Sequence, residues 1–287
     1  MNNGAIVELS GSEGIDFIQR ISTNDVSKLE VGGMKRTVLA NERGRIIDVV
    51  SLFRRDQESL MLVGQGIDPQ QLISWLEKFI IMEDLRTNDL TSSYVMFILF
   101  SDETIDEAGA APALPSDFIL LDESNASGNL FRLVCPKDGH SLALDWLRRS
   151  GFVEVGVEGL DEFRIRHTIP WYGKELTEQY NPLEAGLGAL VDWTKGCYIG
   201  QEVIARLDTY KKIQRSLVRL KLSAIPSEIP SPIFSGSSEV GTITTTTTLM
   251  APESLALGYM KVAFLGSEGG NLRTGREKEI DVEILNH

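Results

Sequence analysis

Cys197 is the residue whose surroundings most suggest chemistry. It lies in the segment Lys195 to Glu202, which reads Lys-Gly-Cys-Tyr-Ile-Gly-Gln-Glu. Apolar residues at helical spacing follow this segment, so Cys197 is predicted just before a helix N-terminus. Free backbone N–H groups there, together with the Lys195 ammonium, would favour the thiolate. Cys197 is therefore either a reactive thiol or a small buried hydrophobe in a glycine-flanked turn. The apolar stripe consists of Val203, Ile204, Leu207 and Tyr210.

Asp48 is a second candidate, because it is a carboxylate inside the apolar run Ile-Ile-Asp-Val-Val. Strand alternation places it on the same face as Ile46, Val50 and Leu52 and predicts that it is buried. Burying a carboxylate without a partner is costly. Asp48 therefore either accepts backbone hydrogen bonds as a structural residue or meets a ligand amine with a perturbed pKa.

The element that positions Asp48 is predicted to be a hairpin of two strands, 36–40 and 45–53. The connecting residues Asn-Glu-Arg-Gly form a turn in which Gly44 can supply a positive φ. Other strand–helix units surround this hairpin in the sequence. Strands are expected over 5–9, 59–63, 118–121 and 130–134, and helices after the caps Ser12 and Asp68, around 142–147 and over 160–167.

From Leu217 onward the sequence consists of short segments with the residue pattern of β-strands. These predict a small C-terminal β-barrel. The run Thr244 to Thr248 is interpreted as an edge strand without chemistry. Residues 101–116, rich in Asp, Glu, Ala and Pro, are expected to form a long solvated loop. The barrel strands are expected over 217–222, 240–248, 255–262 and 280–285.

Composition and charge argue against several classes of function. Hydrophobic residues make up 42% and charged residues 24%, as is ordinary for a globular protein. The formal charge of -13 argues against direct binding of nucleic acid. Cys135 and Cys197 are the only cysteines, too few for an Fe–S cluster held by four thiolates, and no metal site is predicted. We see no signal-peptide pattern and no apolar stretch long enough to cross a bilayer, so a cytoplasmic location without a membrane role is expected.

Residues 195–206 resemble the signature of the YgfZ branch of the aminomethyltransferase, or glycine cleavage T-protein, superfamily. Further segments that resemble this superfamily are 23–26, 41–48, 161–173 and 181–186, so the resemblance covers most of the chain. It implies an α+β, multidomain, aminomethyltransferase-like folate-binding fold. Residues 1–213 would form the folate-binding region, as two interleaved subdomains, and 214–287 a C-terminal β-barrel domain. The matching signature positions are Lys195, Gly196, Cys197, Tyr198, Gly200, Gln201, Glu202 and Arg206.

The resemblance also implies roles for single residues. Asp48 takes the catalytic position and would contact folate, as would Arg164 and Tyr172, while Cys197 would act on a partner or a one-carbon adduct. One position departs from the superfamily. Arg132 stands in the strand segment where aminomethyltransferases carry a glutamate that grips the pterin. Arginine cannot accept the pterin's N–H donors, so the pterin must be held differently.

Three functions remain open at the level of sequence. The leading hypothesis is a YgfZ-like accessory protein that binds tetrahydrofolate or a derivative and supports assembly or repair of Fe–S enzymes, and thereby tRNA modification. Its partners would be a reduced folate and Fe–S enzymes or assembly factors. The first alternative is an aminomethyltransferase that moves a one-carbon unit from a lipoyl carrier to tetrahydrofolate, which Asp48 favours. The second is a non-catalytic folate-sensing scaffold in which Cys197 is structural.

Overall fold

The structure is a computed structural model that describes residues 4–102, 113–126, 128–247, 254–266 and 271–285. Its chain divides into two compact units built from segments that are distant in sequence. The first unit contains Met1–Ala40, Ile47–Glu154 and Leu190–Ile199, and the second contains Asn41–Ile46, Val155–Ala189 and Gly200–His287.

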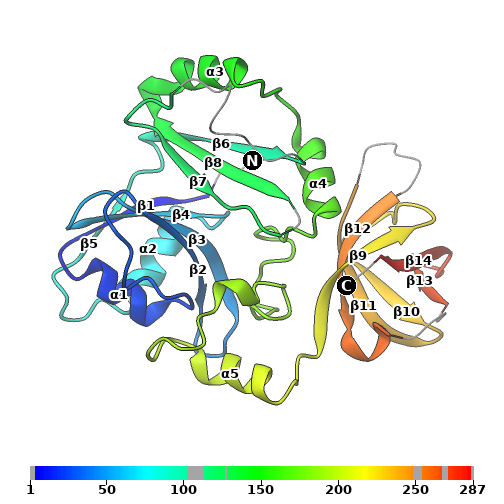
Figure 1. The fold of residues 1–287 in the computed structure, drawn as a ribbon. Helices are drawn as coiled ribbons and strands as arrows, with labels where there is room; N and C mark the ends of the chain where they lie inside the picture. The colour runs from blue at the N-terminus through cyan, green and yellow to red at the C-terminus, as the bar shows by residue number, and fades with distance from the viewer. Residues whose placement is uncertain (1–3, 103–112, 127, 248–253, 267–270, 286–287) are drawn as a thin grey trace. The chain divides into compact units, whose positions relative to one another are not determined.

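A five-stranded sheet in the first unit carries Asp48. The strand order is β2-β3-β4-β1-β5, and α2 packs against β1 and β5 (Figure 1). Asp48 lies on β3, which has β2 and β4 as neighbours, so it lies inside the sheet and not at its edge. The predicted hairpin is confirmed, and Gly44 in its turn has a φ of 67°. The bounds are β1 (Ile6–Ser10), α1 (Gly14–Ile21), β2 (Met34–Ala40), β3 (Ile46–Arg54), β4 (Ser59–Gly64), α2 (Pro69–Glu77) and β5 (Arg86–Asp89).

The two helices of this sheet differ in how well their starts follow from sequence. Helix α2 begins at Pro69 as predicted, and the Asp68 carboxylate accepts hydrogen bonds from the backbone N–H groups of the next turn. Helix α1 begins at Gly14 after an N-cap at Glu13, so the expected cap at Ser12 is wrong. Ser12 lies one residue further out, in the turn that follows Gly11, where φ is 136°.

A three-stranded sheet with the order β6-β8-β7 completes the core of the first unit. Trp146 and Leu147 of α3 pack with Leu133 on this sheet. Met96 and Val134 join a second cluster with residues of β1 and β4, so the two sheets share apolar contacts. Most of the loop expected at 101–116 lies outside the described residues. The bounds are β6 (Tyr94–Ser101), β7 (Ile119–Asp122), β8 (Asn129–Pro136), η1 (Lys137–Gly139) and α3 (His140–Arg149).

The second unit contains a closed six-stranded barrel, β10-β11-β12-β9-β14-β13, so the predicted α+β fold with a C-terminal barrel is confirmed. The sequence did not reveal β10 and β13, which are short. The threonine run lies at the end of β11, where Thr245 and Thr246 pair with β12 and the pairing with β10 has already ended at Ile243. Thr248 lies outside the described residues. The bounds are α4 (Val157–Arg166), η2 (Gly188–Leu190), α5 (Gln201–Thr209), β9 (Arg215–Leu222), β10 (Ser231–Ser235), β11 (Ser238–Thr246), β12 (Ser254–Lys261), η3 (Val262–Phe264), β13 (Leu272–Thr274) and β14 (Ile280–Leu285).

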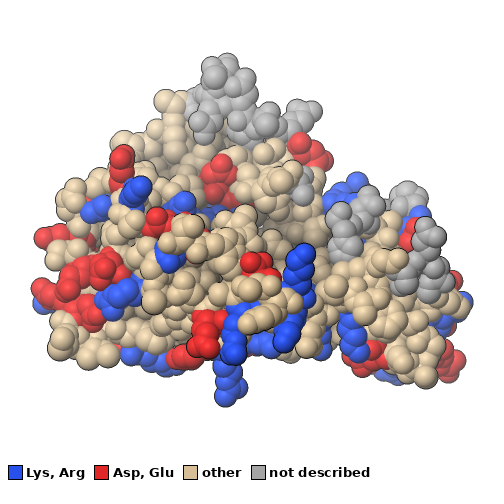
Figure 2. All heavy atoms as spheres, turned by 60° about the horizontal axis from the view of Figure 1, so that its bottom comes forward, with Lys and Arg blue, Asp and Glu red and all other residues tan. Residues whose placement is uncertain are grey.

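Charged side chains of both signs lie on the surface. Acidic and basic side chains are intermingled over the described residues of the face in Figure 2, where no continuous basic surface is seen. Within the described ranges, no helix has the length and apolar character needed to cross a membrane.

Candidate functional site

Asp48 is completely buried, with 0% of its surface exposed. Its Oδ2 accepts a hydrogen bond from the backbone N–H of Gln65, at 3.0 Å. Its Oδ1 has no hydrogen-bond partner among the described residues. Oδ2 therefore fits the structural alternative, in which Asp48 accepts a backbone hydrogen bond, while Oδ1 is a buried acceptor without a partner among the described residues.

Burial governs the acidity of Asp48. Desolvation raises its pKa from 3.8 to about 7, although backbone N–H groups and the charge of Arg132 oppose this shift. A carboxyl group with such a pKa exchanges its proton near neutral pH, which suits a general acid or base.

Arg132 lies beside Asp48 and is also completely buried, on β8. Its Nη1 donates to the carbonyl oxygen of Gly64 at 2.9 Å, and its Nε donates to Glu123 at 2.9 Å. Ser51 donates to the other Glu123 oxygen at 2.6 Å. Arg132 is therefore held in an internal ion pair.

Glu123 is the acidic centre of this cluster. Burial alone would raise its pKa, but the charges of Arg132 and Arg36 and the hydrogen bonds from Ser51 and Arg132 together lower it. Arg36 of β2 also donates to the Glu123 carbonyl oxygen at 2.7 Å. Glu123 is thus ionised, whereas the pKa of Asp48 lies near neutral. Two buried carboxyl groups in one unit are set to different protonation states by their surroundings.

Lys195 is anchored by the segment that follows α1. Its Nζ donates to the carbonyl oxygens of Ser22 and Asn24, at 2.8 and 2.7 Å. Burial lowers its pKa to about 8, against the opposing charges of Asp25 and Asp192. Lys195 therefore ties the signature loop to the Thr-Asn-Asp-Val element, Thr23 to Val26, one of the segments that resemble the superfamily.

Cys197 is exposed and free. The interpretation of Cys197 as a small buried hydrophobe is therefore wrong, because the loop presents its thiol to solvent. Helix α5 begins at Gln201, so the expected helix start just after the cysteine is confirmed. The apolar stripe is shorter than expected, since Tyr210 is 63% exposed and lies beyond the helix end.

The remaining signature residues have different structural roles. Tyr198 is buried, and Lys195 lies over its ring at 5.3 Å from Nζ to the centroid. Gly200 has a φ of 80°, and a Cβ there would lie 2.6 Å from the carbonyl oxygen of Asn41, so this position requires glycine. Gly196 has open space around it. The other members are Gln201, the first residue of α5, and the exposed pair Glu202 and Arg206.

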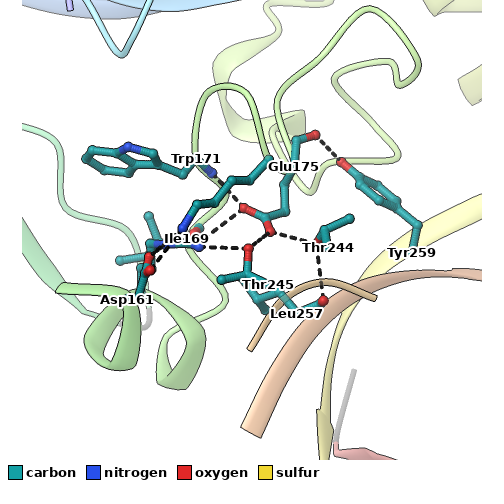
Figure 3. A network of polar contacts seen from close by, with 10 residues as sticks. Asp161, Ile169, Trp171, Glu175, Thr244, Thr245, Leu257 and Tyr259 are labelled. Carbon is teal, nitrogen blue, oxygen red and sulfur yellow. Dashed lines mark hydrogen bonds and ion pairs between the residues drawn. The ribbon is translucent and has the colours of Figure 1, made fainter. Parts of the chain in front are cut away.

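Arg164, a predicted folate contact, lies in the second unit within a buried polar network. Figure 3 labels its partners Asp161, Glu175 and Thr245. Its Nε donates to Asp161 at 2.6 Å and its Nη1 to Glu175 at 2.8 Å. Its Nη2 donates to the Thr245 hydroxyl at 2.8 Å. The guanidinium is 1% exposed, so the three nitrogens of Arg164 all serve contacts within this unit.

Glu175 is the centre of this network, and no sequence pattern had pointed to it. Its Oε1 accepts hydrogen bonds from Thr244 and Thr245, both at 2.6 Å, and its Oε2 accepts the Trp171 N–H at 3.0 Å. A register shift between Ile243 and Thr245 marks a bulge at Thr244, which lets two consecutive hydroxyls reach one carboxylate. The threonines thus bind the 170–176 segment to the barrel.

Tyr172, the other predicted folate contact, lies in that segment. It is half-buried and forms an isolated bridge with Leu176. Gly173 follows it with a φ of 75°. The side chains of Asn181 and Glu184, from the last matching segment, each accept a hydrogen bond from the other residue's backbone N–H, so together they cap a turn.

Similar proteins point to one superfamily. Residues 1–100 match the family model described as GCVT N-terminal domain. The aminomethyltransferase of Halalkalibacterium halodurans is 26% identical over 91% of this chain and 78% of its own length. That of Symbiobacterium thermophilum is 27% identical, over 89% and 76%. These matches support the glycine cleavage T-protein superfamily. They do not support the YgfZ branch in particular, which stays a prediction.

One solved structure shares its fold with this chain along the full length of the chain. The crystal structure of glycine cleavage system aminomethyltransferase T from Bartonella henselae covers 100% of this chain and 83% of its own, with a TM-score of 0.78 at 21% identity. Asp48 falls within the residues matched by the T-protein family model, whereas Arg132, Arg164 and Cys197 lie beyond them.

Proposed function

We propose that this protein binds a reduced folate and acts as an aminomethyltransferase-like enzyme that transfers a one-carbon unit to it. The observation that carries the proposal is Asp48, a buried carboxyl group on a central strand with one oxygen unpaired among the described residues. Tetrahydrofolate fits this atom because its ring and bridge N–H groups are donors that a carboxylate oxygen accepts. The aminomethyltransferase relatives support the reaction class.

Asp48 would move a proton in this reaction. A folate nitrogen that bonds to the incoming carbon must lose its proton, and a carboxylate with a pKa of about 7 can take it near neutral pH. Because Asp48 is fully buried, folate must displace part of its covering. The Gly64–Gln65 peptide stays in place, because it donates to Oδ2 and not to Oδ1, the oxygen proposed for folate.

Tyr172 and Arg164 are retained as proposed parts of the folate site. The contacts of Arg164 favour an indirect role, since its three nitrogens already donate within the second unit. Through its ion pair with Glu175, Arg164 would hold the segment that carries Tyr172. Tyr172 would contact the ligand.

Turnover tests this proposal directly. We expect the purified protein, supplied with an aminomethyl-lipoyl carrier and tetrahydrofolate, to form methylene-tetrahydrofolate, ammonia and the dihydrolipoyl carrier. Asp48→Asn should lower kcat by roughly 100-fold or more. Asp208→Asn, the same change at an exposed position on α5, is the matched control and should leave kcat unchanged. Tetrahydrofolate binding by the wild type without any turnover would contradict the enzyme proposal.

A second candidate function is supported by the exposed thiol of Cys197 and the signature around it. In this case the protein is a YgfZ-like accessory factor that uses bound folate and Cys197 to support Fe–S enzymes. Cys197→Ala should then keep the wild-type affinity for tetrahydrofolate but lower Fe–S enzyme activity in cells. Unchanged cellular activity in this variant would remove the accessory candidate.

A further inference from the structure

A single peptide group connects Arg132 to Asp48. The carbonyl oxygen of Gly64 accepts from Arg132 Nη1 at 2.9 Å, and the N–H of Gln65, in the same peptide group, donates to Asp48 Oδ2 at 3.0 Å. A cation on the carbonyl end polarises the peptide and makes its N–H a stronger donor. Arg132 therefore acts on Asp48 through this peptide as well as through its charge.

Backbone hydrogen bonds also hold this peptide and the one before it. The Gln65 N–H is shared, because it donates to the carbonyl oxygen of Val49 at 3.1 Å as well as to Asp48, and the Gly64 N–H, in the preceding peptide group, donates to the carbonyl oxygen of Ala5 at 2.8 Å. A Cβ on residue 64 would lie 2.6 Å from Asp48 Oδ2. Glycine at this position is what lets the carboxylate approach the peptide.

The charged groups around Asp48 come from the elements packed beside it. Arg132 lies on β8, Glu123 follows β7 and Arg36 lies on β2. Of these three groups, Arg132 lowers the pKa of Asp48 and so opposes the effect of burial. Glu123 fixes the orientation of the Arg132 side chain by accepting a hydrogen bond from its Nε. Removing Arg132 thus removes one hydrogen bond to the Gly64–Gln65 peptide and a charge that favours the Asp48 carboxylate.

Resting on the proposed function, we propose that Arg132 is a positioning residue for Asp48. It holds the Gly64–Gln65 peptide so that Oδ2 is occupied by the protein and Oδ1 is the oxygen offered to the folate amine. The arginine at the position of the superfamily's pterin glutamate then serves the reacting carboxylate and does not replace the pterin contact.

The test compares two substitutions that break the same ion pair. Arg132→Gln and Glu123→Gln each remove the Arg132–Glu123 interaction, but only the first removes the contact with Gly64. The titration of the Asp48 carboxyl carbon is followed by NMR in the folate-free protein, with Asp48→Asn to assign the signal. We expect the midpoint to rise by about one pH unit or more in Arg132→Gln. In Glu123→Gln it should not rise.

Arg132→Lys is the rescue variant, because it keeps the charge and a donor for the Gly64 carbonyl. Its midpoint should lie closer to the wild-type value than that of Arg132→Gln. If Arg132→Gln does not fold, the comparison is made between the Arg132→Gln/Glu123→Gln double variant and Glu123→Gln, with the same expected rise. Equal midpoints in the two arms of either comparison would overturn the proposal.

Binding of tetrahydrofolate separates this inference from the proposed function. If the wild type binds no folate, the proposed function fails, while the NMR titration still decides whether Arg132 controls Asp48. If the wild type binds, the affinity of Arg132→Gln should fall at least about tenfold and that of Arg132→Lys less. Full affinity in a folded Arg132→Gln would show that Arg132 does not position Asp48 for the ligand.

Discussion

Arg132 and Asp48 lie at opposite ends of one peptide group, the Gly64–Gln65 peptide, which accepts from the first and donates to the second. This arrangement leaves Asp48 with a pKa of about 7, because burial outweighs the favourable charge of Arg132. A direct buried ion pair would instead stabilise the charged carboxylate more strongly. The relationship keeps Asp48 able to exchange a proton near neutral pH.

Asp48→Asn should make the protein more stable above neutral pH. The native pKa is raised from 3.8 to about 7, so the folded protein keeps a proton that the unfolded chain releases. The contribution of Asp48 to the free energy of unfolding is fully present below about pH 4 and is lost as pH rises to about 7. At pH 8 the variant should be more stable by a few kcal/mol, since each pH unit between the two pKa values contributes at most about 1.4 kcal/mol. Urea unfolding at pH 5 and pH 8 measures this difference, with Asp208→Asn as the control. A variant less stable than the wild type at pH 8 would count against the raised pKa.

Gly64→Ala should disturb Asp48 without touching Arg132. The added Cβ would lie 2.6 Å from Asp48 Oδ2 and 3.0 Å from a methyl carbon of Ile67. We expect a loss of about 1–3 kcal/mol in the free energy of unfolding and weaker tetrahydrofolate binding. Gly196→Ala, which has open space, is the stability control and should be nearly neutral. Equal stability of the two variants would argue against a close approach at Gly64.

Glu175→Gln should destabilise the protein strongly. The carboxylate is completely buried and accepts hydrogen bonds from Arg164, Trp171 and two threonine hydroxyls (Figure 3). A glutamine would place an NH2 group among groups that are themselves hydrogen-bond donors, and Arg164 would lose its anionic partner. We expect the free energy of unfolding to fall by about 3–5 kcal/mol. Glu239→Gln, on the exposed side of β11, is the matched control for urea unfolding. A loss below about 1 kcal/mol would mean that the network contributes little.

The two thiols should react at very different rates. Cys197 is exposed, whereas Cys135 is buried and desolvation, aided by nearby carboxylates, raises its pKa to about 11. A thiol reagent such as dithiobis-nitrobenzoate should therefore label Cys197 quickly in the native protein and Cys135 only after denaturation. Cys197→Ala should abolish the fast phase and change the free energy of unfolding by less than about 0.5 kcal/mol. A fast phase that persists in this variant would contradict the assigned exposure.

Local chemistry made part of the fold predictable. Asp68 and Pro69 fix the start of α2 by capping and by a preset φ, and Gly44 fixes the hairpin turn. These signals involve residues close together in sequence. The barrel could be predicted from the short β-like segments that follow Leu217. Strand β13 has only three residues, which are too few for an alternating apolar pattern to appear.

The surroundings of the candidate site could not be predicted in the same way. Asp48 was found because a carboxylate inside an apolar strand is rare, yet the contact of Arg132 with Gly64 joins residues 68 positions apart. Thr244 and Thr245 reach Glu175 across about 70 positions, through a bulge that no sequence pattern marked. Such partners depend on the tertiary fold, and local patterns carry no information about them.

Calorimetric titration of tetrahydrofolate into the wild type, Asp48→Asn and Asp208→Asn tests the central claim most directly. Asp48 is proposed to offer a buried carboxylate oxygen to the folate amine, and a buried hydrogen bond of this kind to a charged group contributes about 1.5–3 kcal/mol. We therefore expect saturable binding to the wild type and to Asp208→Asn, with affinity lower by about tenfold or more in Asp48→Asn. Equal affinities of all three proteins, or no binding by the wild type, would contradict the account.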